Sequence, residues 1–150
     1  MDDPRLIYVE KIIEAPAADV FRVLDDLDRY PDWNPFTTRV ITDRVIGGQV
    51  ELHVNMPGSG LRVQRERFTG YVPGERLSWG LRWGGGVLLD CDRVQQVEAQ
   101  PDGTTRYVTY ERFNGLLGGL VVRLYGAAVR RGFEQCADAL ALRAKTLGAT

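Results

Sequence analysis

The spacing of hydrophobic residues changes along the chain and separates three regions. An Ile-, Val- and Tyr-rich segment predicts a first strand at Leu6–Ile13. Pro16 is typical of a first helical turn, and the apolar residues after it recur at helical spacing. These residues are Val20, Phe21, Leu24 and Leu27. Pro31 and Pro35 predict that the helical region ends and that Tyr30–Phe36 is irregular.

Six further strands are predicted in the middle region, because Gly- and Pro-containing turn signals separate segments with a strand-like pattern. The predicted strands are Arg39–Ile46, Gln49–Met56, Leu61–Val72, Arg76–Trp83, Val87–Val97 and Thr104–Asn114. Their connections are too short for the crossover that parallel neighbours need. We therefore expect an antiparallel meander.

The last region returns to helical spacing. Leu116–Lys145 contains no proline and is rich in Ala, Leu and Arg, which predicts one long helix. Its apolar stripe consists of Val122, Gly126, Val129, Phe133, Cys136, Ala137, Leu140 and Ala144. Each glycine weakens a helix by about 1 kcal/mol relative to Ala, so the glycine-rich first half is expected to be kinked or loosely formed. The order of elements indicates an α+β fold.

Length and charge narrow the function classes. The 150 residues predict a single domain, 1–150. A net charge of −1 provides no basic surface for nucleic acid, so no nucleic-acid partner is expected. The longest apolar run, Leu116–Val122, is too short to cross a membrane, and the N-terminus lacks the pattern of a signal peptide. We expect a cytoplasmic protein without stable membrane insertion, and a homodimer remains one open alternative.

Metal and cofactor chemistry has little support in the sequence. Cys91 and Cys136 lie too far apart for a CxxC motif, which favours buried free thiols and leaves a bridge between them open. His53 is the only histidine, which argues against His-based zinc sites and His-dependent triads. We therefore predict no metal and no cofactor.

Several short motifs, in order along the chain, resemble one known superfamily. Ile13–Phe21 contains an "I-x-A-P…V-F" opening, and Asp28–Phe36 contains "Y-P-x-W-N-P". Further matching segments are Arg76–Trp79, Gly103–Arg106, Glu111–Gly115 and Gly132-Phe133. The set resembles the SRPBCC or START-like superfamily, and within it the polyketide cyclase/dehydrase and lipid-transport group.

The resemblance implies a helix-grip fold like that of the Bet v-type allergens. In that fold a curved antiparallel sheet of about seven strands surrounds a long C-terminal helix, with two short helices after the first strand and a cavity between sheet and helix. Many relatives carry a histidine in the sixth strand where this chain has Asp92. The superfamily includes carriers, sensors and cyclases, so the fold does not fix the activity.

Aromatic residues are the first candidates for a ligand site. Trp79 and Trp83 alternate with Leu77 and Leu81 and so share one face of a strand. Trp33, in the segment after the first helices, would form a rim or lid. A cavity lined by such rings would suit a planar or polycyclic ligand, and the alternative is an ordinary core.

Carboxylates are the second candidates. Thr105, Tyr107, Thr109, Glu111 and Phe113 share one face of the last strand, which we expect to be the inner face. A four-residue turn at Gln100–Gly103 would place Asp92 opposite Glu111 and Asp90 opposite Phe113. Facing buried carboxylates would have a raised pKa, as a general acid or base requires. The alternative is a bulge that turns these charges to the surface.

The leading hypothesis is a protein that binds a small hydrophobic or aromatic molecule, such as a polyketide-like metabolite or a lipid. The residues expected to line the cavity are Trp33, Phe36, Trp79, Trp83, Asp90, Asp92, Tyr107, Glu111, Phe113, Val129 and Phe133. The rival hypothesis is a cofactor-free cyclase, aromatase or dehydratase in which Asp92, Glu111 or Tyr107 moves protons. Enzymatic activity is left open. A regulatory module is disfavoured, because the chain has no charged tail or additional segment for a partner.

Overall fold

The computed structural model describes residues 3–148, which form one antiparallel sheet of seven strands in the order β1-β7-β6-β5-β4-β3-β2. The strands are β1 (Leu6–Ile13), β2 (Thr37–Thr42), β3 (Gln49–Met56), β4 (Gly60–Val72), β5 (Arg76–Trp83), β6 (Leu89–Ala99) and β7 (Thr105–Asn114). The α-helices are α1 (Ala17–Asp25), α2 (Tyr30–Trp33) and α3 (Gly118–Gly148), with short 3-10 helices at Leu27–Arg29 and Gly84–Gly86.

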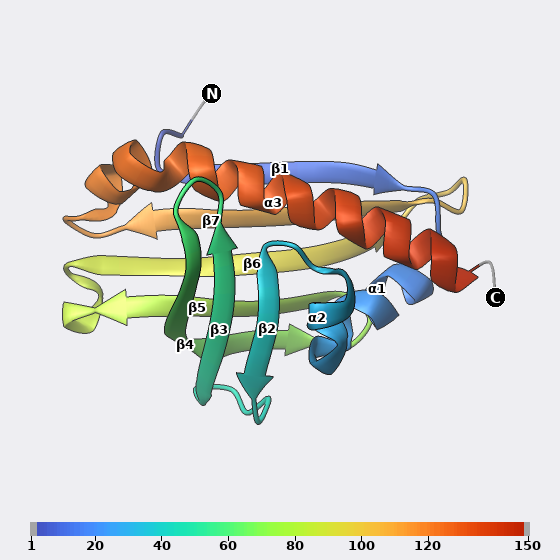
Figure 1. The fold of residues 1–150 in the computed structure, drawn as a ribbon, viewed down its shortest axis with the longest axis horizontal. Coiled ribbons are helices and arrows are strands. Elements are labelled where there is room, and N and C mark those ends of the chain that lie inside the picture. Colours follow the sequence, from blue (N-terminus) through green and yellow to red (C-terminus); the bar gives the residue numbers. More distant parts are fainter. Residues whose placement is uncertain (1–2, 149–150) are drawn as a thin grey trace.

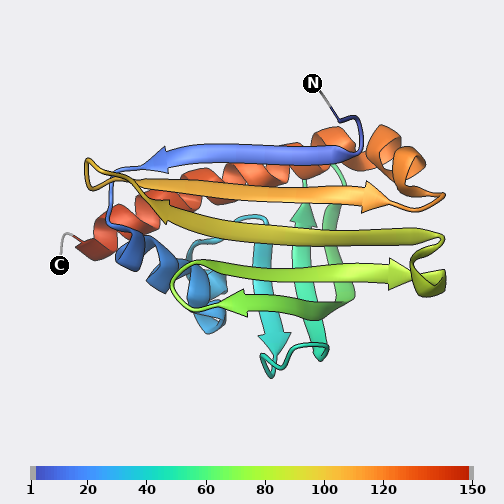
Figure 2. The same cartoon turned by 180° about the vertical axis from the view of Figure 1, so that it is seen from behind.

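The sheet curls around α3. In Figure 1, β1, β7, β6 and β5 run side by side, whereas β2 and β3 stand across them on the side of α3. Figure 2 shows the same arrangement from behind, with the long strands in front of the helix. The helix contacts β1, β7 and β3 of the sheet and also α1. The predicted helix-grip fold is confirmed.

Most predicted elements are confirmed, and four differ. β6 runs over Leu89–Ala99 and not over Val87–Val97, because Gly84–Gly86 form a 3-10 helix and Val87 still has helical backbone angles. β2 starts and ends earlier than predicted, and its earlier end follows from Arg44, whose positive φ of 63° interrupts the extended backbone. The prediction of an irregular Tyr30–Phe36 is wrong for Tyr30–Trp33, which form the short helix α2; Pro31 lies in its first turn, where no N–H donor is needed. α3 runs without interruption through the glycines that were expected to loosen it.

Gly132 has a packing role in α3. A β-carbon at this position would lie 2.2 Å from the ring of Phe36, so only glycine lets that ring approach the helix. The same ring packs edge-on against Phe133, with 5.9 Å between the ring centroids. The predicted stripe of α3 faces this core, and both cysteines are buried and free.

One part of the sheet divides. β4 pairs with β3 from Gly60 to Arg67, but it pairs with β5 only from Arg67 to Val72. The first half of β4 therefore separates from the end of β5. We call the region between residues 65–67 of β4 and 80–83 of β5 the fork. Gly80 stands at its closed end, where a β-carbon would lie 2.4 Å from the carbonyl oxygen of Cys91.

No helix within residues 3–148 has the length and apolar character needed to span a bilayer. In the same part of the chain, no three His, Cys, Asp or Glu side chains come together as a metal site would require.

Candidate ligand-binding site

Strands β6 and β7 direct a row of polar side chains toward α3. Their register pairs Arg93 with Glu111 and Gln95 with Thr109. Because successive side chains point to opposite faces of a strand, every second residue of β6 and β7 faces inward. They are Cys91, Arg93, Gln95 and Val97 of β6, and Thr105, Tyr107, Thr109, Glu111 and Phe113 of β7. The predicted inner face of β7 is confirmed, whereas that of β6 is wrong.

The error on β6 comes from the length of one loop. Ala99 pairs with Thr105, so the loop has five residues, Gln100–Thr104, where four were predicted. The carboxylate of Asp102 holds Thr104 in the loop by accepting hydrogen bonds from its backbone N–H (3.0 Å) and its hydroxyl group (2.6 Å). A one-residue shift turns every side chain of a strand to its other face.

Asp90 and Asp92 therefore lie on the outer face of the sheet. Asp92 is opposite Arg112, and its carboxylate accepts a hydrogen bond from the Thr69 hydroxyl at 2.5 Å. Burial raises the pKa of Asp92, and the Thr69 hydrogen bond opposes this rise. Asp90 lies 3.9 Å from Arg82. The prediction that these aspartates face Glu111 and Phe113 is wrong.

Arg93 takes the interior position that Asp92 was expected to have. Its residue is 4% exposed, and its guanidinium group lies 4.3 Å from the centroid of the Phe133 ring. Nε and Nη1 donate to the hydroxyl groups of Thr109 (3.2 Å) and Thr37 (3.4 Å). Nη2 is buried, and among the residues described it has neither a hydrogen-bond partner nor a carboxylate within salt-bridge distance. An interior cation without an ion pair is unusual, because burial of a charge is costly.

Two glutamates complete the interior polar group. Burial is the main cause that raises the pKa of Glu66 to about 8, and the charge of Glu111 adds to it. Burial likewise raises the pKa of Glu111 to about 7, although the Cys91 thiol and Arg93 favour its charged form. Because the two groups influence each other, they titrate as a pair. Near neutral pH the two carboxyl groups together hold a proton, so the pair can both donate and accept a hydrogen bond.

The predicted aromatic and aliphatic lining residues lie in three different places. Phe36, Trp79, Tyr107, Phe113, Val129 and Phe133 are all buried in the core between sheet and helix. Trp33 is partly buried against Tyr30, with 5.1 Å between the ring centroids, and its buried indole N–H has no hydrogen-bond partner within the described chain. Trp83 is 50% exposed at the end of β5, so it lies at the fork and not in the interior.

The Tyr107 hydroxyl group is engaged inside the core. It donates a hydrogen bond of 2.6 Å to the side-chain carbonyl of Gln95. Burial raises the pKa of Tyr107 above its ordinary value, so the hydroxyl group stays protonated. This arrangement makes Tyr107 a fixed dipole of the core and a poor proton carrier.

A cleft of about 430 Å³ opens at the fork. Its lining residues are Gly47, Gln49, Arg65, Glu66, Arg67, Gly80, Leu81, Arg82 and Trp83. A larger surface hollow of about 560 Å³ lies at the other end of β5 and β6, around Gly74–Arg76 and Gln96–Ala99. Of these two, the cleft at the fork includes a member of the interior polar group, Glu66, and so it connects that group with solvent.

Glu66 and Arg93 were not among the predicted site residues. The sequence could have identified Arg93. Leu89, Cys91 and Val97 lie on the same face of β6 as Arg93, and their apolar character predicts that this face points inward. For Glu66 the pattern of apolar residues along β4 predicts the wrong inner face. Leu61 and Val63 point outward, 64% and 52% exposed, whereas the face that carries Glu66 is more polar.

Solved structures confirm the fold. The chain is similar to the Zhui aromatase/cyclase of Streptomyces sp. R1128, with a TM-score of 0.75 and 20% identity over 94% of this chain and 93% of that one. It is also similar to a START superfamily protein of Mycobacterium smegmatis, with a TM-score of 0.70 and 19% identity over 95% and 98% of the two chains. Norcoclaurine synthase of Thalictrum flavum gives a TM-score of 0.68 at 15% identity over 95% of each chain.

No curated protein matches this sequence at a significant level. The family model described as polyketide cyclase/dehydrase and lipid transport matches residues 5–145, nearly the whole chain. The protein therefore belongs to the polyketide cyclase/dehydrase and lipid-transport family.

Proposed function

We propose that the protein binds a small, largely apolar molecule on the concave side of the sheet, reached through the fork. Glu66, Glu111 and Arg93 are its polar contact points. The surrounding aromatic core, which includes Phe36 and Phe133, provides the apolar surroundings. The family description and the fold of the similar structures support this class of function.

The buried Arg93 is the observation that carries the proposal. A protein core gains no stability from an unpaired cation, and replacement of buried charges by apolar residues is often neutral or stabilising. The free Nη2 donor and the proton held by the two glutamates therefore have a better explanation in ligand recognition than in folding. They suit a ligand with an oxygen atom on an apolar frame.

Calorimetric titration with neutral aromatic alcohols such as 2-naphthol tests the proposal. Glu111→Gln should weaken binding about tenfold, because the amide cannot act as a carboxylate acceptor. Asp92→Asn is the matched control, since Asp92 lies on the outer face, directly next to Arg93, the pairing partner of Glu111. Equal affinities of the parent and Glu111→Gln, or no saturable binding of any neutral probe, would reject the proposal.

A cofactor-free cyclase, aromatase or dehydratase is the second candidate function. The specific observation in its favour is the carboxyl pair, because aldol-type ring closure needs a base at carbon and an acid at the carbonyl oxygen. Glu111 and Glu66 would fill these roles in place of Asp92 and Tyr107. On a polyketide-like substrate, either amide variant should lower turnover by about 10²–10⁴-fold. Unchanged turnover in both variants would exclude this mechanism.

A further inference from the structure

Three arginines surround the mouth of the cleft. Arg65 and Arg67 occupy alternate positions of β4 and so project from the same face, and Arg82 faces them from β5. Glu66 is the one acidic residue in the lining. The mouth therefore carries an excess of positive charge, although the whole chain has a net charge of −1.

The three cations are weakly paired. Arg65 lies 3.6 Å from Glu51, and Arg82 lies 3.9 Å from Asp90, both at the long end of the salt-bridge range. Within residues 3–148, the side chain of Arg67 forms neither a hydrogen bond nor an ion pair. Loosely held guanidinium groups can bind an incoming carboxylate or phosphate through paired N–H donors.

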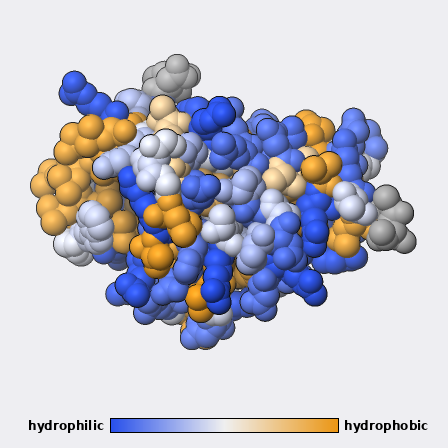
Figure 3. Space-filling model, viewed as in Figure 1, coloured by the Kyte–Doolittle hydropathy of each residue, from blue (hydrophilic) through white to orange (hydrophobic). Residues whose placement is uncertain are grey.

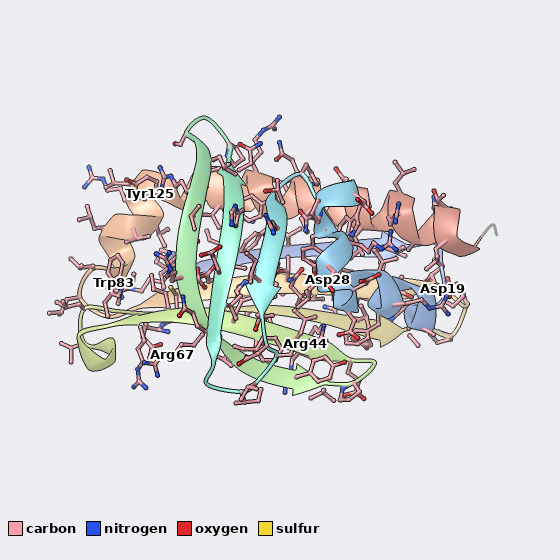
Figure 4. The ribbon with its side chains drawn as sticks, turned by 60° about the horizontal axis from the view of Figure 1, so that its bottom comes forward. Asp19, Asp28, Arg44, Arg67, Trp83 and Tyr125 are labelled. Atoms are coloured by element: carbon pink, nitrogen blue, oxygen red, sulfur yellow. The ribbon has the colours of Figure 1, made fainter. Side chains whose placement is uncertain are left out.

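Apolar side chains form the wall below these arginines. Leu81 is partly buried beside the core, and Trp83 exposes half of its surface although it stands in a strand. Figure 4 shows Trp83 and Arg67 toward the same end of the molecule, on the two strands that separate at the fork. Such a half-exposed indole can cover the chain or ring of a ligand.

Glu66 lies at the inner end of the cleft. Its pKa of about 8 means that its carboxyl group is mainly neutral at pH 7, chiefly because of burial. A neutral carboxyl group does not repel an anion that binds at the mouth. The cleft thus changes from cationic at its mouth to apolar along its wall and uncharged at its inner end.

From this gradient we infer that the ligand is an anionic amphiphile. Its acidic group, a carboxylate or a phosphate ester, binds Arg65, Arg67 and Arg82 at the mouth, and its apolar part lies along Leu81 and Trp83 toward Glu66. This inference rests on the proposed function, because it names the class of ligand that the same site takes. The volume of about 430 Å³ lies within the ordinary range of about 300–1,000 Å³ for small-molecule sites.

Three probes with the same chain and different head groups test the inference. Dodecanoate and dodecyltrimethylammonium are titrated below their critical micelle concentrations and dodecanol below its solubility limit, with tryptophan emission and calorimetry as readouts. Dodecanoate should bind about tenfold more tightly than dodecanol, and the cationic probe should bind most weakly. A parallel titration with dodecyl phosphate shows whether the site prefers a phosphate ester or a carboxylate.

The double variant Arg65→Gln/Arg67→Gln should remove the preference for dodecanoate over dodecanol. Its matched control is Arg39→Gln/Arg131→Gln, which removes the same charge at two exposed positions outside the cleft lining. Trp83→Phe should abolish most of the emission change and weaken dodecanoate and dodecanol alike, while the preference between them remains, and so locates the probe at the fork.

The outcomes separate the inference from the proposed function. Equal binding of dodecanoate and dodecanol by the parent, or an unaltered preference in the Arg65/Arg67 double variant, overturns the anionic amphiphile but leaves apolar binding intact. Failure of dodecanol, dodecanoate and 2-naphthol alike overturns both. An equal loss of preference in the control double variant would assign the effect to net charge and also reject the inference.

Discussion

The ring of Phe36 occupies the space in which a β-carbon of residue 132 would lie, 2.2 Å away. Gly132→Ala should therefore destabilise the protein by about 1–3 kcal/mol, even though alanine is the better helix former by about 1 kcal/mol. Urea unfolding measures the effect. Gly119→Ala is the control, because its β-carbon would meet only the end of the Arg5 side chain at 3.7 Å. That variant should be neutral or more stable, and a stabilised Gly132→Ala would contradict the packing described.

Phe133 joins α3 to the sheet through two kinds of contact. It packs edge-on against Phe36 and lies under the guanidinium group of Arg93. Phe133→Ala should lower the free energy of unfolding by about 3–5 kcal/mol. Thermal and urea unfolding provide the measurement, with exposed Leu142→Ala on the same helix as the control. Unchanged midpoints for Phe133→Ala would show that the helix does not depend on this contact.

The two glutamates predict a stability that depends on pH. Both have a folded pKa above the unfolded value of about 4.5, so the folded state binds more protons than the unfolded state between pH 4.5 and about 8. The stability that this pair contributes is fully present below pH 4.5 and decreases by several kcal/mol as the pH rises through this interval. Urea titrations at several pH values measure the slope. The double variant Glu66→Gln/Glu111→Gln should flatten this pH dependence, whereas the exposed Glu134→Gln should leave it unchanged. An equal slope in the double variant and in Glu134→Gln would show that the two buried glutamates do not cause the pH dependence.

Arg93 holds down the pKa of both glutamates. Its removal in Arg93→Met should raise the pKa of Glu111 further, because burial would act without the opposing charge. Carbon-13 NMR of the labelled side-chain carboxyl groups gives this value directly. Arg130→Met is a suitable control, since that arginine is exposed and bonds the backbone of Tyr8. A lowered or unchanged pKa of Glu111 in Arg93→Met would show that the two groups do not interact.

The sequence predicted the elements better than it predicted the pairing between them. The bounds of β1, β3 and β5 match the structure, because turn residues mark both ends of each strand. The prediction of the site failed for one reason, the length of the loop between β6 and β7. This loop has five residues and is stabilised by Asp102, so Asp92 lies on the outer face and Arg93 on the inner face. Local turn chemistry of this kind is not visible in hydrophobic periodicity.

Glu66 shows a second limit. Its strand carries Leu61 and Val63 toward solvent, and Figure 3 shows further apolar surface gathered at one end of the molecule. A pattern of apolar residues identifies the inner face only where one side of a strand is uniformly covered. β4 changes partner in its middle, so its first half has no such uniform surroundings.

Arg67 is shared by both ladders of β4, with Gln49 on one side and Gly80 on the other. Beyond it, within the described chain, residues 60–66 and 81–83 share no backbone pairing. Beyond Arg67, no inter-strand hydrogen bond within residues 3–148 therefore joins these two arms of the sheet. The sheet thus turns a corner at Arg67, and the passage beside this corner is open without the loss of any backbone pairing in the rest of the meander.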